Sequence, residues 1–183
     1  MNGAVLDATN NVFFKFKHAK LYDVMLATPL GPLDVALGEI TWATIREALY
    51  AVGVLVVLAA LGVLTSLWSL LMLPAALLIC FGFASVGIAG ATFMRSWQHL
   101  EYVQLVLVPM FLFSTTFSPL TVYPPALRVL VQVFPLFHGV EMMRTLAVGP
   151  PTLATLAHAS YFVAMTIVGF AIVTRRLGRL LLK

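Results

Sequence analysis

The sequence predicts an all-α integral membrane protein with four transmembrane helices, an N-terminal cytoplasmic elbow and an outer re-entrant helical hairpin. The 183 residues are 61% hydrophobic and 10% charged, with a mean hydropathy of +1.00, whereas soluble domains carry about 25% charged residues. Several apolar runs also reach the roughly 20 residues that a membrane-crossing helix needs. The net charge of +4 does not require a nucleic-acid partner, because the basic residues cluster beside these apolar runs.

Residues 1–47 are predicted to form a cytoplasmic segment that lies on the membrane and then turns sharply. An imperfect apolar stripe follows one side of its first helix and comprises Val12, Phe13, Phe16 and Ala19. Pro29 breaks this helix, and Gly31-Pro32 starts a second helix that leads into the membrane. The resulting elbow has two open interpretations, a membrane-surface anchor or a docking site for a soluble partner.

Four windows are long and apolar enough to be predicted as transmembrane helices. They are residues 48–68, 70–94, 102–120 and 151–174. The first two windows are joined so closely that they must form an antiparallel pair. Pro74 and Pro109 lie inside windows, where they are expected to kink the helices rather than end them.

The positions of lysine and arginine orient this predicted topology, since these residues favour the cytoplasmic side. With four spans, nine of the 11 basic residues fall on one side, including those of a loop at 95–101 and of a basic tail at 175–183. Arg128 and Arg144 are left on the other side. Both termini are therefore expected in the cytoplasm, in a multi-pass protein of the cell membrane.

Residues 121–150, between the third and fourth windows, are predicted to be an extracytoplasmic re-entrant hairpin. Pro124 and Pro125 suit the first turn of one short helix, and Pro135 separates it from a second. Neither piece is long enough to cross about 30 Å of hydrocarbon. Glu141 and Arg144 are three residues apart and are expected to pair on one helix face.

Several motifs that would indicate another function are absent from the sequence. It contains no GxxxxGK[ST] phosphate loop, no GxSxG and no HExxH, so we expect a chain that is not an enzyme. His138 and Glu141 form an HxxE pair, but two ligands on one turn are weak evidence, and no metal site is predicted. The single cysteine, Cys80, excludes an intrachain disulfide framework.

Small residues recur at four-residue spacing in the second window, as Ser85/Ala89 and Gly87/Ala91. Such faces let two helices approach closely in lipid. Packing within this chain and a subunit interface both remain open interpretations of this pattern.

Two stretches of the sequence together resemble type-2 ABC exporter permeases, especially the nodulation-factor (lipo-oligosaccharide) branch and, more distantly, the daunorubicin-resistance permeases. They are "LYDVMLATPLGPLDVALGEI", followed by an apolar helix pair, and "FSPLTVYPPALRVLVQVFPLFHGVEMMR". The resemblance implies an all-α permease that pairs with itself or a sister permease and moves an amphipathic drug, lipid or lipid-linked saccharide. It also implies two partner ATPase subunits that bind the ATP and magnesium.

The resemblance further assigns roles to two sets of residues. The coupling helix that receives motion from the ATPase would comprise Tyr22, Asp23, Leu26, Ala27, Thr28 and Pro29. The hairpin that closes the outer end of the substrate route would use Pro124, Pro125, Pro135, Glu141 and Arg144.

This sequence departs from the family pattern at its front end. Family members have two spans before the coupling segment, where this sequence has about ten residues that do not cross a membrane. We therefore expect the reading frame to continue upstream of Met1 and to encode two further apolar segments of about 20 residues each. The alternative is a truncated, non-transporting membrane protein that assembles with a full-length permease.

Overall fold

The computed structural model of the chain describes residues 2–17, 32–62, 64, 66–94, 96, 98–117 and 119–181. All regular elements within these ranges are helices. The long helices are α1 (Asn2–Lys17), α3 (Pro32–Ala60), α4 (Met72–Ala91), α5 (Gln98–Leu112), α6 (Pro125–Val133), α7 (Pro135–Val148) and α8 (Leu153–Leu181). Two short 3-10 helices are η1 (Leu67–Leu71) and η2 (Leu120–Val122).

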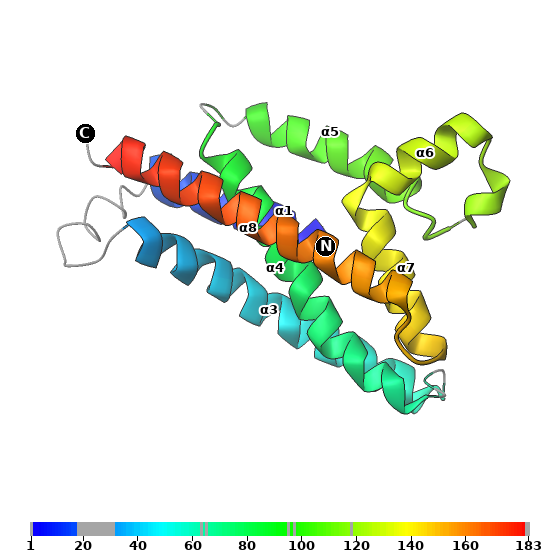
Figure 1. Cartoon of the computed structure of the whole chain (residues 1–183). Coiled ribbons are helices and arrows are strands. Elements are labelled where there is room, and N and C mark those ends of the chain that lie inside the picture. Colours follow the sequence, from blue (N-terminus) through cyan, green and yellow to red (C-terminus); the bar gives the residue numbers. More distant parts are fainter. Residues whose placement is uncertain are drawn as a thin grey trace.

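Helix α4 lies at the centre of a helix bundle and packs against α1, α3 and α8 (Figure 1). Its apolar window is 61% buried, compared with 17% for those of α3 and α8. The difference follows from position, because α4 has neighbours on several sides whereas α3 and α8 keep one face free. A helix that is apolar all round suits this central place.

Small side chains allow the central helices to approach one another closely. A Cβ atom on Gly169 of α8 would lie 2.6 Å from Ser85 Oγ and 2.9 Å from the Ser85 carbonyl carbon on α4. On another face of α4, Gly87 contacts α1, where Thr9 Oγ1 donates a hydrogen bond of 3.1 Å to the Gly87 carbonyl. The sequence left two roles open for these small residues, and at Ser85 and Gly87 they pack helices of the same chain.

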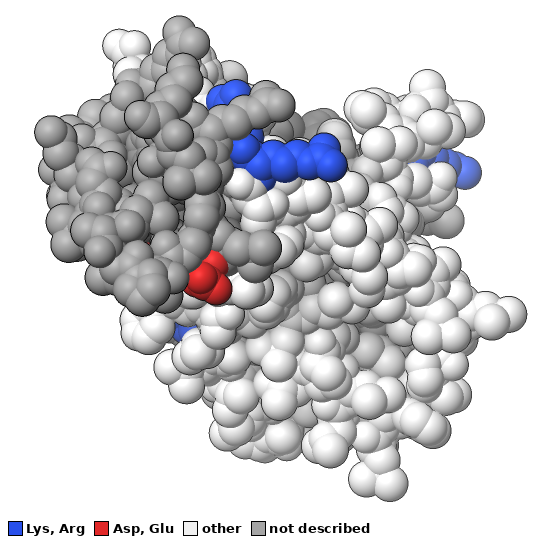
Figure 2. Space-filling view, turned by 60° about the vertical axis from the view of Figure 1, so that its left-hand side comes forward, with Lys and Arg blue, Asp and Glu red and all other residues white. Residues whose placement is uncertain are grey.

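Within the described ranges, three helical segments are long and apolar enough to cross a membrane, or four if the bent pair α6–α7 counts as one span. They are Leu37–Ala60, Leu67–Ala91 and Leu153–Arg176. The face in Figure 2 carries few charged side chains over most of its described area, and the basic ones gather mainly toward one end. An apolar surface of this extent is typical of helices in contact with lipid.

The first membrane segment differs from its prediction. Helix α3 runs from Pro32 to Ala60 without a break, so its candidate span begins at Leu37 rather than at Ala48. This longer span contains Arg46 and Glu47, and the Glu47 residue is only 9% exposed. The predicted window at residues 48–68 excluded both of these charged residues.

The third predicted span also differs. Helix α5 covers Gln98–Leu112, ends well before Leu120 and is not among the candidate spans. Its 15 residues correspond to about 22 Å, less than the roughly 30 Å of a hydrocarbon core. Three residues after the helix ends, Thr115 takes a positive φ of 62°, in the loop that leads to η2.

Helix α1 is part of the bundle, whereas the sequence predicted a helix on the membrane surface. Val12 and Phe13, which belong to the predicted stripe, are buried together with Val5 and Ala8. Near its end, Lys15 Nζ lies 2.7 Å from Glu39 Oε1 of α3. The two helices that flank residues 18–31 are therefore joined by an ion pair.

Candidate functional site

The helix pair of α6 and α7, which the sequence predicts to be an outer hairpin, lies at the end of the bundle opposite the start of α3 and the end of α8 (Figure 1). Its two helices are bent by 86° at Phe134. Pro125 is the first residue of α6 and Pro135 the first of α7, the positions at which the missing N–H group costs least. Phe134, which precedes Pro135, takes the extended conformation that a following proline favours.

Arg144 of α7 fastens the hairpin to the loop after α5. Its Nη1 lies 2.8 Å from Glu141 Oε1, and its Nη2 donates a hydrogen bond of 3.0 Å to the Thr115 carbonyl. The expected pairing of Glu141 and Arg144 is observed, but the sequence did not indicate Thr115. A β-branched residue with positive φ is a conformational outlier, and outliers of this kind cluster at functional sites.

Thr115 is also a fully enclosed polar residue of this loop. It is 1% exposed, and its Oγ1 has no hydrogen-bond partner among the described residues. A strained backbone beside an unsatisfied hydroxyl persists only where neighbouring contacts hold it. The bond from Arg144 is one such contact.

Arg128 fixes the other irregular segment of the hairpin. Its Nε and Nη2 donate hydrogen bonds of 2.7 and 2.9 Å to the carbonyl groups of Tyr123 and Thr121. Irregular backbone near a membrane needs such partners, because water is scarce there. The two arginines on the predicted outer side thus both satisfy carbonyl groups next to the hairpin.

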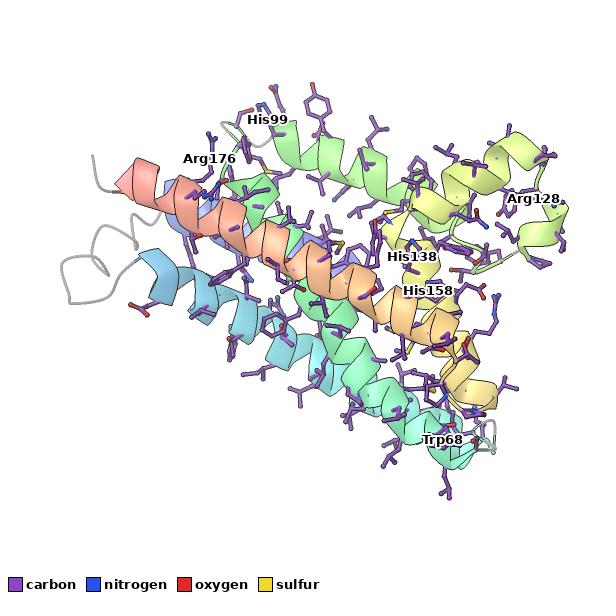
Figure 3. The ribbon with its side chains drawn as sticks, in the orientation of Figure 1. Trp68, His99, Arg128, His138, His158 and Arg176 are labelled. Carbon is purple, nitrogen blue, oxygen red and sulfur yellow. The ribbon has the colours of Figure 1, made fainter. Side chains whose placement is uncertain are left out.

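Two histidines join the hairpin to α8, as Figure 3 shows. His138 Nδ1 of α7 lies 2.8 Å from His158 Nδ1 of α8. The ring of Tyr161 stacks on His138 with the centroids 4.2 Å apart, and its hydroxyl donates a hydrogen bond of 3.3 Å to the Val133 carbonyl. Burial, followed by the charge of His158, lowers the pKa of His138, while the backbone carbonyl of Gln132 acts in the opposite direction.

The sequence did not predict this histidine pair, because its members are separated by 20 residues. The sequence shows His138 only in an HxxE pair with Glu141, which points to no partner on another helix. The one available signal was that His158 lies near the outer end of its helix, at the depth expected for the hairpin.

A largely apolar cavity of about 420 Å³ lies between α4 and α5 and extends to the hinge of the hairpin. Its walls include Phe83 and Gly87 of α4, Val106 and Met110 of α5, and Pro135 of α7. The volume falls within the roughly 300–1,000 Å³ of small-molecule pockets. Such a cavity can accept the apolar part of a molecule, with the hairpin hinge at its edge.

The remaining candidate residues are placed as follows. In the described part of the chain, no group of three or more His, Cys, Asp or Glu side chains is arranged to hold a metal ion. All six candidate coupling residues fall within 18–31, outside the described residues; they are Tyr22, Asp23, Leu26, Ala27, Thr28 and Pro29.

We expect Arg144→Met to loosen the loop at residues 113–117, because methionine keeps much of the apolar stem but cannot donate to the Thr115 carbonyl. Arg144 is 48% exposed, so the loss is about 1 kcal/mol, or about a fivefold increase in local opening. Amide hydrogen exchange in lipid nanodiscs measures this opening. Arg128→Met is the matched control, since it should loosen residues 121–123 and leave the exchange of 113–117 unchanged.

Comparisons with known proteins agree with this architecture. The sequence model of a family described as "ABC-2 type transporter" matches residues 2–148. Nodulation protein J of Rhizobium leguminosarum bv. trifolii is 28% identical over an alignment that covers 100% of this chain and 70% of the relative. Nodulation protein J of Rhizobium meliloti (strain 1021) is 26% identical, with 100% and 70% covered.

No solved structure matches the chain, so the assignment depends on sequence. The family match covers well over half of the residues, and it includes α6 and α7 and most of the central bundle. The chain therefore belongs to the ABC-2 type transporter family.

Proposed function

We propose that the chain is the membrane-spanning permease subunit of an ATP-driven exporter that moves an amphipathic substrate out of the cell. The substrate class comprises drugs, lipids and lipid-linked saccharides. Membership of the ABC-2 type transporter family and similarity to nodulation protein J support a transport role. In this proposal the chain lies in the cell membrane with both termini in the cytoplasm.

The observation that carries the proposal is the outer hairpin. It is hinged at Pro135, is bonded to the α5 loop through Arg144, and borders the apolar cavity between α4 and α5. A lid over one end of an apolar route can open to release a molecule and close again, so that the membrane is not left permeable between transport events. The hairpin therefore suits the exit side of a transporter of molecules with an apolar part.

The energy source would lie on another chain. This sequence lacks a phosphate loop, and ABC-2 family membership implies a partner ATPase subunit, which would bind ATP and magnesium. A homodimer or a pair with a sister permease would complete the route, since one chain supplies only part of a cavity wall. The lipid bilayer is the remaining partner.

The proposal is tested by co-purifying the chain with the ATPase encoded beside it, in lipid nanodiscs. We expect a stable complex whose ATP hydrolysis is stimulated by the exported substrate. An ATPase that never joins the chain would remove the main support for export and favour a non-transporting assembly partner.

The position of the hairpin relative to the membrane gives a separate prediction. Cysteines introduced at Thr121 and Gly149 should both react with an impermeant thiol reagent applied outside the cell, because a re-entrant segment returns to the side from which it entered. A cysteine at Gln98, at the start of α5, should stay unreactive until the membrane is opened. If Thr121 and Gly149 were labelled from opposite sides, the segment would cross the membrane and the hairpin assignment would be wrong.

A further inference from the structure

The contact between α7 and α8 includes one hydrogen that is shared between two titratable rings. In the neutral pair, one Nδ1 carries a hydrogen and the other accepts it across 2.8 Å. One added proton leaves this bond intact, because a charged imidazole still donates to a neutral one. A second added proton places N–H groups on both Nδ1 atoms, and two cations then face each other at hydrogen-bond distance.

We propose that His138 and His158 form an acid-sensitive latch, which holds the outer hairpin against α8 at neutral pH and releases it when both imidazoles are protonated. This inference goes beyond the proposed function, because it concerns a movement of the hairpin and needs no assumption about the substrate.

The surroundings of the pair favour the closed, incompletely protonated state. His138 lies in the first turns of α7, where the helix dipole opposes a positive charge. Tyr161 covers one face of the His138 ring, and Phe137 packs edge-on against both imidazoles. These rings limit the access of water, which would otherwise stabilise two charges.

The charged groups around the pair do not supply a substitute bond. Glu141 of α7 interacts electrostatically with His158, but its Oε1 is bonded to Arg144. From α8 the pair meets the hydroxyl of Tyr161, which donates to the Val133 carbonyl. Arg128, the charged residue of α6, binds the Tyr123 and Thr121 carbonyls.

The other elements packed against α7 contribute no charge to this contact. Helix α4 carries Cys80 as its titratable group, and η1 carries none. Cys80 lines a different cavity, together with Glu47 of α3. Among the described residues of these elements, Glu141 is thus the one carboxylate near the pair, and it is shared with Arg144.

The direction of the pH effect follows from the lowered pKa of His138. The open hairpin binds protons more readily than the closed one, because its histidines have the ordinary pKa of about 6.5. The closed form is therefore fully favoured above that value and loses stability as the pH falls through and below it. Acidification on the outer side should open the hairpin.

The test is a distance measurement between the hairpin and α8 in the full chain. Spin labels are placed on cysteines at Val129 of α6 and Leu156 of α8, which are 65% and 62% exposed, in a Cys80→Ala background. Pulsed electron paramagnetic resonance in nanodiscs then compares about pH 7.5 with about pH 5, on either side of the ordinary histidine pKa. We expect one distance at the higher pH and a second, longer population at the lower pH, which disappears when the pH is restored.

Three histidine variants give the matched comparison. Asparagine can place an amide near the position of Nδ1 but does not titrate, so His138→Asn and His158→Asn should each remove the acid-induced population. His99→Asn is the control, because His99 lies on α5 with its Nδ1 at 2.8 Å from Ser96 Oγ, and this variant should keep the response. Identical distances at both pH values without these substitutions, or an acid response that survives in both the His138 and His158 variants, would overturn the latch. Either result would leave the proposed function standing, since no transport step is measured.

Discussion

Gly169→Ala is expected to prevent stable packing of α8 on α4 and so to cause a large loss of stability from the addition of a single methyl group. The added Cβ would lie 2.6 Å from Ser85 Oγ and 2.9 Å from the Ser85 carbonyl carbon. A hydroxyl can rotate away, but the carbonyl carbon belongs to the backbone, so the two helices must separate. Over-packing of this kind costs about 1–3 kcal/mol or more, and thermal unfolding in detergent, followed by size-exclusion chromatography, measures it.

Two further variants separate this steric effect from the general effect of replacing a glycine. A Cβ on Gly90 of α4 would meet no atom within 4 Å, so Gly90→Ala should be neutral or stabilising by up to about 1 kcal/mol, as expected in a helix. Combining Ser85→Gly with Gly169→Ala removes the clash with the serine side chain and should restore part of the stability. Equal unfolding temperatures for the Gly169 and Gly90 variants would show that the close approach is not important.

The features that could be predicted from sequence are those set by local composition. Long apolar runs predict α4 to within three residues and the apolar span Leu153–Arg176 of α8 to within two, because hydrocarbon requires an uninterrupted apolar helix. Pro125 and Pro135 mark helix starts for a similarly local reason, since proline lacks the N–H group that a helix interior needs. The pair formed by Glu141 and Arg144 follows from helical spacing alone.

The features that the sequence did not reveal depend on contacts between distant residues. The partners Ser85 and Gly169 come from different helices, and nothing in either local sequence identifies the other. The hydrogen bond from Arg144 to Thr115 spans 29 residues, and the left-handed conformation of Thr115 contradicts its local preference. The ion pair of Lys15 with Glu39 likewise links two helices, and the burial of Val12 and Phe13 makes α1 part of the bundle rather than a surface helix.

A change of charge in the predicted coupling helix should abolish export while the protein still inserts into the membrane. The double variant Asp23→Lys with Ala27→Asp alters residues that lie outside the described part of the chain, but the helices on both sides of them are described. Helices α1 and α3 both pack on α4, and Lys15 and Glu39 join them at 2.7 Å. A force applied to residues 18–31 would therefore reach the central helix of the bundle, whereas a surface anchor would have no need of such a connection.

The expected loss of export has an electrostatic cause. Reversing the sign of a charge at a docking surface places it against a like charge of the partner, which costs several kcal/mol. ATP-dependent export from proteoliposomes measures the effect, and membrane insertion is checked separately by fractionation. The matched control is Gln98→Asp with Glu101→Lys, which makes the same net change of charge on exposed residues of α5 and should leave export nearly unchanged. Normal export by the Asp23/Ala27 variant would exclude the coupling role. Weakened insertion, with export retained per inserted molecule, would instead assign residues 18–31 to anchoring, because an anchor holds the chain to the lipid without transmitting force.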